Sequence, residues 1–596
     1  MYQPMRTKLK PLALSLTSSL KSSLKLSLSL GLALTLNACT STTPNSHSEP
    51  TQNLDHYLSR SVQDEVFYFV LPDRFYNGDS SNDNGSKTLK ISQGGFKPDF
   101  KGGYHGGDVP GLEQKLDYIQ DMGVTAIWLT PILRNQAVQN GVSGYHGYWV
   151  LDFTQIDPHL GTNADLKSFI DAAHAKNIKV YFDIITNHTA DVIKFKECHG
   201  EDGLGWSADD NKCPYKTLAQ VKAGDKYTTV IPKGSKDVKF PAWLNDPKYY
   251  HNQGDTSFVG EDSIYGDFFG LDDIDTDSPE VVSGMIDIFN NIVSEFKPDG
   301  FRVDTVKHVN MEFWQQFSPA VTAHAKSIGI PNFFMFGEVY SGDSDVLSSY
   351  TTTGKLPSVL DFGFQGAVYD AIVAGKSNHS LKNLFANDYK YNDSDSNANQ
   401  LLNFIGNHDM GRIGYFLSNP EFNWSEEQKL KRTKLAHALM FFARGIPVIY
   451  YGDEQGFTGN GGDHLARQDM MPSLVAEFNQ DDLIGTDKTT ADDNFDQSHV
   501  LYQAFKSYAD LYQSHKALRQ GEHKTLFASK DAGIYAFSRT LDDQSYYLVF
   551  NTAKQSKKFK LPPGLTLVGG NSESSPTQSS TNPIEVSDLS FAIYRW

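Results

Sequence analysis

Short apolar segments alternate with helical segments along most of this chain, and that alternation restricts the fold more than any other feature of the sequence. Helical patterns near 112–122 and 163–176 each lead into such a segment. Strands that alternate with helices form parallel sheets, and eight such units close into a (β/α)8 barrel. The segments rich in β-branched and aromatic residues lie at 66–70, 124–129, 178–183, 300–304, 333–338, 358–361, 401–405 and 446–450. The sequence therefore predicts an α/β fold, a (β/α)8 TIM barrel.

The uneven spacing of these segments indicates further parts. About 110 residues separate the third segment from the fourth. This stretch is rich in Gly, Asp, Lys and Pro and has no clean helical period, so we expect an inserted subdomain at 189–272, after the third strand. Beyond 516 the pattern changes to short alternating strands, which is typical of an antiparallel β-sandwich domain at 517–596. The barrel would then occupy 61–188 and 273–516.

The first 38 residues have the composition of an export signal. Basic residues stud a Leu- and Ser-rich stretch that ends in a short apolar run and Leu36-Asn37-Ala38-Cys39. The run is too short to cross a bilayer of about 30 Å. The last four residues resemble the bacterial lipoprotein cleavage box, which implies lipidation of Cys39 and a tether at 39–60. Thr40, in place of an Asp that often retains lipoproteins at the inner membrane, favours the outer membrane. The alternative is an ordinary signal peptide with an incidental cysteine.

Only two other cysteines, Cys198 and Cys213, are present. In an exported protein we expect them to form a disulfide that closes one loop. The formal net charge of −18 argues against nucleic-acid binding, which needs a basic face. It is compatible with neutral substrates and with bound divalent cations.

Polar side chains gather at the ends of four predicted strands. They are Asp183 with Asn187-His188, Arg302 with Asp304 and Lys307-His308, Glu338, and Asn407-His408-Asp409. The carboxyl ends of barrel strands converge on one face, where active sites are built. Cleavage of a glycosidic bond needs one carboxylate at the sugar carbon and a second, protonated carboxyl at the leaving oxygen. Arg302 and Asp304 stand two apart on a strand and therefore face the same cavity.

These motifs resemble those of glycoside hydrolase family 13, the α-amylases and their relatives, over residues 62–596. Asp183…Asn187-His188, Gly300-Phe-Arg302-Val-Asp304-Thr-Val-Lys307-His308, Glu338 and Phe404-Ile-Gly-Asn407-His408-Asp409 are similar to its four motif regions. The resemblance implies Asp304 as nucleophile, Glu338 as general acid/base and Asp409 as a carboxylate that binds sugar hydroxyls. It implies a hydrolase of α-1,4-glucosidic bonds in starch, glycogen or maltooligosaccharides that retains the anomeric configuration.

The same resemblance implies a set of substrate contacts. Tyr145-His146-Gly147-Tyr148-Trp149 is similar to a segment that binds and stacks on the sugar at the cleavage point. Asp463 and Arg467 are similar to a pair that holds the next sugar inward. The implied substrate-binding residues are His146, Tyr148, Trp149, His188, Arg302, Lys307, His308, His408, Asp463 and Arg467.

The resemblance also implies calcium, which prefers mixed carboxylate, amide and carbonyl oxygens. One ion would be held by Asn187, Asp273 and the backbone carbonyls of Ile264 and His308. A second would be held in a loop similar to one in cyclodextrin glucanotransferases, for which a solvated Asx-rich turn is the alternative. Its ligands would be Asn77, Asp79, Asn82, Asp83, Gly106 and Asp108.

Two other functions fit these residues. Within the family, the chain could be a transglycosylase or a cyclomaltodextrin-acting enzyme, although Thr305 to His308 favour an ordinary α-amylase. In another class, it could be a non-catalytic glucan-binding lipoprotein, against which the presence of all three carboxylates counts. The partner is an α-glucan in each case, and we expect a monomer.

Overall fold

The computed structural model describes residues 54–206, 212–571 and 583–596, and these belong to one compact unit that begins at Thr51. The signal peptide, Cys39 and the tether up to residue 53 lie outside the described residues. Among the residues that are described, no helix is both long and apolar enough to cross a membrane.

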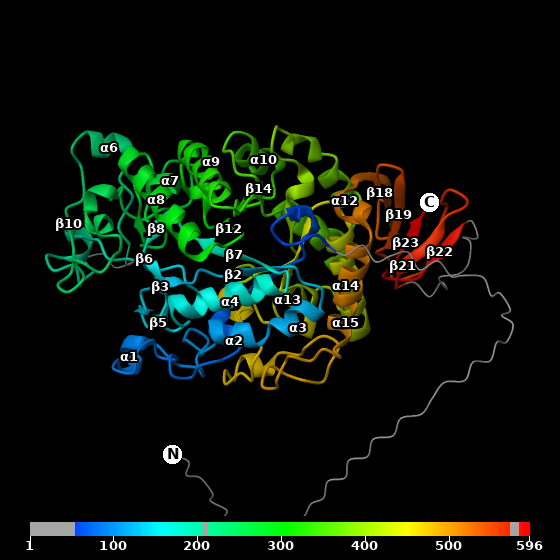
Figure 1. Cartoon of the computed structure of the whole chain (residues 1–596), viewed down its shortest axis with the longest axis horizontal. Coiled ribbons are helices and arrows are strands. Elements are labelled where there is room, and N and C mark those ends of the chain that lie inside the picture. Colours follow the sequence, from blue (N-terminus) through cyan, green and yellow to red (C-terminus); the bar gives the residue numbers. More distant parts are fainter. Residues whose placement is uncertain (1–53, 207–211, 572–582) are drawn as a thin grey trace, which may run out of the picture. The chain divides into compact units, whose positions relative to one another are not determined.

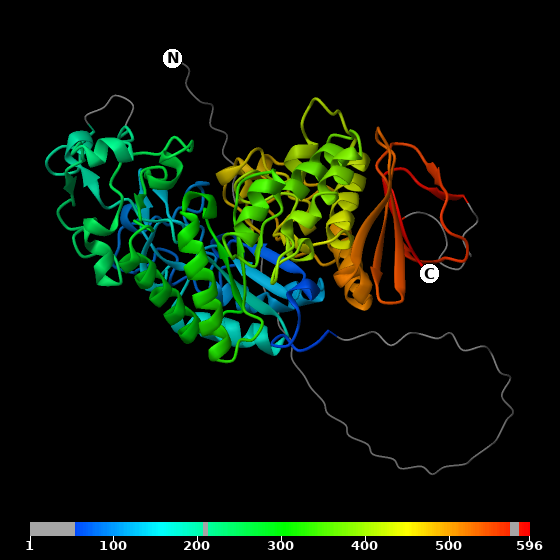
Figure 2. The same ribbon diagram turned by 90° about the horizontal axis from the view of Figure 1, so that it is seen from above.

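Eight parallel strands form one sheet in the order β14-β13-β12-β7-β2-β1-β16-β15. Figure 1 labels the neighbouring strands β2, β7 and β12 of this sheet, and Figure 2 shows the same ribbon from above. An isolated parallel bridge between Leu360 and Leu402 joins the two edges and closes the barrel. The predicted (β/α)8 barrel is therefore confirmed. In chain order the strands are β1 Phe67–Val70, β2 Ala126–Leu129, β7 Lys179–Ile184, β12 Gly300–Val303, β13 Phe334–Gly337, β14 Ser358–Val359, β15 Leu402–Asn403 and β16 Ile446–Tyr450.

These strands are buried along their whole length, because helices cover the outer side of the barrel and side chains fill its interior. Their near-continuous apolar composition follows from this burial. The longer helices between strands are α4 Asn163–Ala175, α8 Pro279–Phe296, α9 Met311–Ser327 and α14 Glu426–Phe442. Thr162 and Ser425 cap α4 and α14 through capping boxes. The helix expected near 112–122 is two helices, α2 Val109–Gln114 and α3 Leu116–Asp121, because Lys115 leaves the helical conformation.

The segment that follows β7 contains only short elements. Its first strand, β8 His188–Thr189, pairs antiparallel with β11 Asp272–Asp273, so its two ends lie side by side at the end of β7. The buried Asp272 carboxylate accepts hydrogen bonds from the backbone of Val192 and Ile193 and is ion-paired with Lys239. Cys198 and Cys213 form a disulfide within this segment. The β8–β11 pairing therefore fixes the base of the segment, and the disulfide cross-links its interior.

The C-terminal part is a five-stranded antiparallel sheet in the order β17-β18-β19-β23-β21, with a separate pair, β20 and β22. Arg539 in β18 donates hydrogen bonds to the backbone carbonyls of Phe442 and Gly521, which ties the sheet to the end of α14. Phe591 in β23 packs against Phe442 with ring centroids 5.7 Å apart. The strands are β17 Glu522–Ala528, β18 Ile534–Leu541, β19 Gln544–Asn551, β20 Lys557–Phe559, β21 Thr566–Gly570, β22 Ile584–Val586 and β23 Ser590–Arg595.

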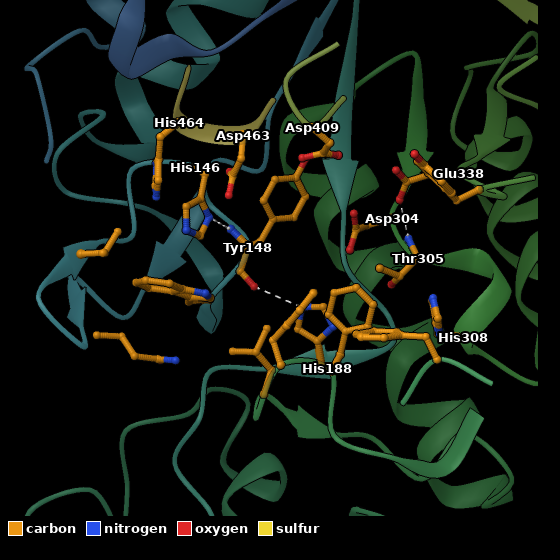
Figure 3. Close-up of a pocket in the computed structure, with 18 of the residues that line it drawn as sticks. His146, Tyr148, His188, Asp304, Thr305, His308, Glu338, Asp409, Asp463 and His464 are labelled. Atoms are coloured by element: carbon orange, nitrogen blue, oxygen red, sulfur yellow. Dashed lines mark hydrogen bonds between the residues drawn. The ribbon is translucent and has the colours of Figure 1, made fainter. Parts of the chain in front are cut away.

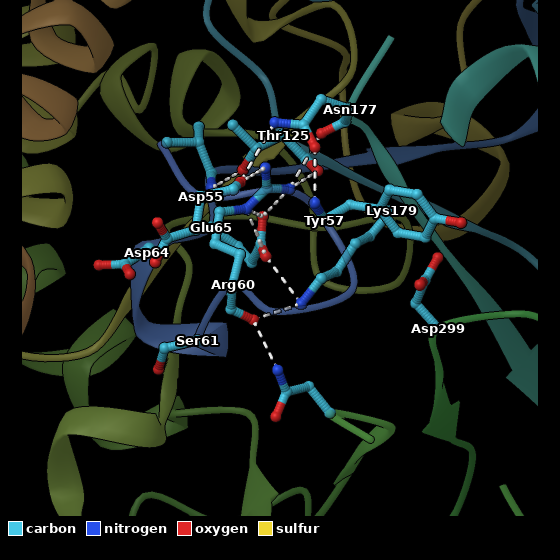
Figure 4. Close-up of polar contacts among 12 residues, drawn as sticks. Asp55, Tyr57, Arg60, Ser61, Asp64, Glu65, Thr125, Asn177, Lys179 and Asp299 are labelled. Atoms are coloured by element: carbon cyan, nitrogen blue, oxygen red, sulfur yellow. Dashed lines mark hydrogen bonds and ion pairs between the residues drawn. The ribbon is translucent and has the colours of Figure 1, made fainter. Parts of the chain in front are cut away.

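The N-terminal segment is fastened by a buried ion cluster of Arg60, Glu65 and Lys179 (Figure 4). The Arg60 guanidinium lies 2.9 Å from Glu65 and donates to the carbonyls of Thr125 and Asn177. Lys179 donates to the Arg60 carbonyl at 2.9 Å and pairs with Glu65 at 3.0 Å. Thr125 precedes β2 and Lys179 begins β7, so the cluster lies at the amino ends of the strands. This is the end of the barrel opposite to the predicted site.

Candidate active site

Arg302, a buried side chain of β12, connects the carboxylates at the ends of three neighbouring strands. Its Nη1 lies 2.7 Å from Asp183 and 2.7 Å from Asp304, and its Nη2 lies 2.9 Å from Glu338. The strand register brings these groups together. Arg302 is opposite Asp183 in β7 and opposite Phe336 in β13, and Glu338 follows Phe336 by two residues. A planar guanidinium with several donors can hold carboxylates on two of its edges at once. Asp304 and Glu338 are thus fixed on either side of one cation.

The turn after Asp304 gives Glu338 a second donor (Figure 3). Thr305 has a φ of 48°, a left-handed conformation that is rare for a β-branched residue and costs on the order of 1–3 kcal/mol. Its backbone N–H points at Glu338 Oε2, 3.1 Å away. The strained residue therefore stands between the two carboxylates and contacts one of them through its backbone.

Burial and neighbouring charges move the pKa values of these groups. Burial raises the pKa of Glu338 to about 7, against the opposing effect of Arg302. Burial also raises the pKa of Asp304, while Arg302 lowers it by charge and by hydrogen bond. Arg302 contacts both carboxyls, but only Asp304 accepts a hydrogen bond from it that lowers its pKa, so we assign the ionised form to Asp304 and the proton to Glu338.

A second group of contacts surrounds the Tyr148 hydroxyl, which lies 3.0 Å from Asp183 and 2.7 Å from His408 Nε2. Burial lowers the pKa of His408 and of His146, and it lowers the pKa of His188 to about 4. These imidazoles are therefore neutral at pH 7 and can both donate and accept hydrogen bonds. Such groups are suited to hydrogen bonding with sugar hydroxyls, which also both donate and accept.

Asp409 differs from the other carboxylates because its side chain is 41% exposed. Arg467 lies 3.1 Å from Asp409 and 2.5 Å from Asp463, and it also donates to the His408 carbonyl. Arg467 therefore aims Asp409 at the cavity. Asp463 forms an ion pair with the same guanidinium.

These residues line a cavity of about 820 Å3 at the carboxyl ends of the strands. Asp304, Glu338 and Asp409 all face it. Two of the sequence-predicted residues, Arg302 and His408, lie beneath its lining and act on it through the contacts described above. The remaining predicted residues that line it are His146, Tyr148, Trp149, His188, Lys307, His308, Asp463 and Arg467.

Sequence reasoning did not single out several residues of this cavity. Asp183 lies beneath the cavity and bonds Arg302; its motif gives it no role of its own, although its position at a strand end is an available signal. His464 follows Asp463 and bonds the Tyr145 hydroxyl at 2.6 Å, and no local pattern marks it. Phe258, Phe269 and Tyr340 also line the cavity, and isolated aromatic residues in loops give no sequence signal.

Contacts join the residues of the first predicted calcium position in two pairs, Asn187 with the strand of Asp273 and His308 with the turn of Ile264. Ile274 N donates to the Asn187 carbonyl at 2.9 Å, and Asp273 pairs with His188 across β8 and β11. His308 Nδ1 contacts the carbonyl of Ser263, next to Ile264, at 2.8 Å. The Asn187 Oδ1 atom is buried and has no hydrogen-bond partner. An oxygen ligand without a partner, beside a buried carboxylate, fits a hard cation.

The second predicted position is also compact. Asp108 accepts hydrogen bonds from Gly78 N, Asp79 N and Asn82 Nδ2 at 2.9 to 3.0 Å. Asn77 Nδ2 contacts Asp83 at 2.8 Å, and a Cβ at Gly106 would approach both side chains closely. The Asn82 Oδ1 atom is buried without a partner. The six residues therefore form one cluster with a free oxygen ligand.

A closed eight-stranded barrel with carboxylates, an arginine and imidazoles on its carboxyl-end face defines the class of (β/α)8 glycoside hydrolase folds. The chain belongs to the alpha-amylase family, because the family model described as "Alpha amylase, catalytic domain" matches residues 69–521.

Individual relatives agree with this assignment. An alpha-amylase of Streptomyces lividans is 47% identical over 77% of this chain, and the match spans 52% of that protein's length. A cyclomaltodextrin glucanotransferase of Klebsiella oxytoca is 27% identical over 87% of this chain and 75% of its own. The crystal structure of an alpha-amylase from Geobacillus thermoleovorans, complexed with acarbose, matches 90% of this chain and 99% of its own at 26% identity, with a TM-score of 0.65.

Proposed function

We propose that this protein is a retaining, endo-acting hydrolase of α-1,4-glucosidic bonds in starch, glycogen or maltooligosaccharides. The observation that carries the proposal is the contact of Arg302 with Asp304 on one side and Glu338 on the other, inside one cavity. A retaining glycosidase needs one ionised and one protonated carboxyl around the same bond. The raised pKa of Glu338 and the hydrogen bond that Asp304 accepts from the guanidinium supply that difference.

In this mechanism Glu338 donates its proton to the leaving oxygen while the Asp304 carboxylate attacks the sugar carbon. Asp409 and the neutral imidazoles of His146 and His188, which line the cavity, bind hydroxyls of the same sugar. Glu338, now ionised, takes a proton from the incoming water, whose oxygen displaces Asp304. Arg302 keeps its contacts throughout and holds the two carboxyls in register.

Product analysis tests this proposal. A defined maltooligosaccharide should give shorter linear products whose fresh anomers are α, as seen by NMR. Asp304→Asn should abolish hydrolysis while its calcium content stays that of the wild type. Normal hydrolysis by that variant would overturn the assignment of the nucleophile, and β products would overturn retention. Glucan binding without hydrolysis by the wild type would instead favour the non-catalytic lipoprotein.

A transglycosylase or cyclomaltodextrin-acting enzyme is the second candidate. Three exposed aromatic side chains line the cavity, Phe258 at 38%, Phe269 at 76% and Tyr340 at 55% exposure. Apolar sugar faces stack on such rings, so an acceptor sugar could compete with water. The similarity to cyclomaltodextrin glucanotransferases supports this reading. Cyclic products, or transfer that exceeds hydrolysis on soluble starch, would decide in its favour.

Calcium at both predicted positions is part of the proposal. The unpartnered oxygens of Asn187 and Asn82 support it. The first ion would balance the buried charge of Asp273 and pin the base of the inserted segment, and the second would balance the charge of Asp108. A chelator should lower the melting temperature, and metal analysis after dialysis should find two calcium equivalents. No calcium in the dialysed protein would contradict this part of the proposal.

Attachment to the outer membrane through a lipid on Cys39 is proposed from the sequence alone. Palmitate labelling of the expressed protein, with Cys39→Ala as the control, tests it. Label in the wild type only, in the outer-membrane fraction, is the expected result. Equal secretion of both forms without label would indicate an ordinary signal peptide.

A further inference from the structure

A cluster of His251, Asp275 and Asp277 lies where the inserted segment rejoins the barrel. One ligand atom from each residue lies within 4.8 Å of the others. Asp275 and Asp277 lie between β11 and α8, and His251 lies in an earlier loop, before the short helix α7 Asp262–Tyr265. Neither the proposed reaction nor the two predicted calcium positions uses these three side chains.

The orientation of His251 is fixed by its other ring nitrogen. His251 Nδ1 lies 2.6 Å from Asp273 Oδ2. Because an ionised carboxylate only accepts hydrogen bonds, Nδ1 carries the proton and donates it. A histidine must be neutral to bind a metal ion, and with the proton on Nδ1 its lone pair is then on Nε2. A carboxylate that binds the far nitrogen of a metal-ligating histidine is the usual arrangement in metal sites, where it fixes the tautomer and ring orientation.

His251 Nε2 is directed into the cluster and lacks a partner. The side chain is 7% exposed, and Nε2 is buried without a hydrogen bond. It faces Asp275 Oδ1 at 3.2 Å, but without hydrogen-bond geometry. Nε2 therefore faces a carboxylate at ion-pair distance without a hydrogen bond, and a cation bound in the cluster would take the place of the proton that this ion pair otherwise needs.

We propose that His251 Nε2, Asp275 and Asp277 bind a divalent transition-metal ion of the Zn2+ type. One imidazole nitrogen and two carboxylate oxygens suit such borderline ions, whereas calcium and magnesium take oxygen ligands almost exclusively. Asp275 is partly exposed and Asp277 is exposed, so water can reach the ion and complete its coordination. The Tyr265 ring packs edge-on against His251 at 5.0 Å and shields the imidazole side.

The site has a structural consequence for the inserted segment. Asp273 is also predicted to bind calcium. It would contact the ion held by His251, Asp275 and Asp277 only through the His251 ring. The ion would link the loop that carries His251 to the residues that start α8. It would thereby cross-link the end of the inserted segment to the barrel, independently of the disulfide.

Zinc binding to the full-length protein tests the proposal. The chelator-treated protein is titrated with Zn2+ by calorimetry while excess Ca2+ fills the oxygen-only positions. Wild type should bind one Zn2+ that His251→Gln does not bind, and Asp277→Asn should bind it at least about tenfold more weakly. Asp287→Asn removes the same charge from the exposed face of α8, outside the cluster, and should leave zinc affinity unchanged. Co2+ should give visible d–d absorption in the wild type that His251→Gln lacks.

Three results would overturn the proposal. These are no zinc binding by the wild type, equal zinc binding by wild type and Asp277→Asn, and displacement of zinc by the excess calcium. The exposed Asp277 variant keeps the test decisive if the buried His251 variant fails to fold. The assay does not measure hydrolysis, so its outcome is separate from that of the proposed enzymatic function.

Discussion

At the scale of single residues, the geometry of the site depends on Arg302. Its two terminal nitrogens serve different carboxylates, so neither Asp304 nor Glu338 can move without losing a contact with the guanidinium. A lysine at this position would offer a point charge on a flexible stem in place of a planar fork.

We therefore expect Arg302→Lys to lower kcat by about two to three orders of magnitude, comparable with the loss of one preorganised donor. KM should change much less, since Arg302 lies beneath the cavity lining. Steady-state kinetics on a maltooligosaccharide check this. Arg134→Lys, at an exposed position of β3 Leu133–Asn135, is the matched control and should behave as wild type. A variant with normal kcat would contradict the role given to Arg302.

The pKa of Glu338 predicts the alkaline side of the pH profile. Glu338 must be protonated to act as the acid, so kcat/KM should fall as pH rises through about 7. The apparent value belongs to Glu338 together with Asp304, because the two carboxyls interact. Glu338→Gln should lose most of the rate and this alkaline limb together. With maltosyl fluoride, whose leaving group needs no proton, the variant should retain far more activity. An unshifted limb in Glu338→Gln would assign it to another group.

At the scale of elements, the inserted segment is stabilised by cross-links and buried charge more than by regular structure. Its elements are short, and its base is the two-residue pairing of β8 with β11. A segment of this kind has little helical or sheet cooperativity of its own. Its stability should therefore respond strongly to loss of a cross-link.

The disulfide between Cys198 and Cys213 closes a loop with a sequence separation of 15. Loop-closure entropy for that length predicts that the double Cys→Ser variant loses about 3 kcal/mol of unfolding free energy. Urea unfolding measures the loss. The cavity is lined by residues outside this loop, so kcat should not change. Equal stability of the double variant and the wild type would show that the cross-link constrains little.

At the scale of the whole molecule, one barrel carries all other parts, and its two ends have different roles. The carboxyl ends of the strands hold the cavity, and the amino ends hold the Arg60, Glu65 and Lys179 cluster. Glu65 and Lys179 are almost completely buried, so the cluster is stable only while its charges are paired.

Arg60→Ala would leave Glu65 with Lys179 alone and would remove the hydrogen bonds that Arg60 donates to the carbonyls of Thr125 and Asn177. We expect a loss of about 3–5 kcal/mol of unfolding free energy, measured in urea. Lys101→Ala breaks an ion pair with Glu477 that is 32% and 47% exposed, and it should cost less than about 1 kcal/mol. Similar losses for both variants would mean that burial does not set the strength of the Arg60 contact.

The sequence by itself determined the barrel and most of its site. Strand positions follow from local apolar runs. Asp304 and Glu338 come directly after such runs, and Asp409 follows another within a few residues. Burial of each strand on both faces leaves that signal in consecutive residues, so no long-range information is needed to find it.

The tertiary structure decided which of these residues meet and what else they meet. Arg302 contacts Asp183 across 119 positions of sequence, and Asp273 meets His251 across 22. The left-handed backbone of Phe258 and Phe269, and the free Nε2 of His251, likewise arise from packing. Local periodicity reports whether a residue is buried, but not which partner buries it, because that depends on how distant segments come together in space.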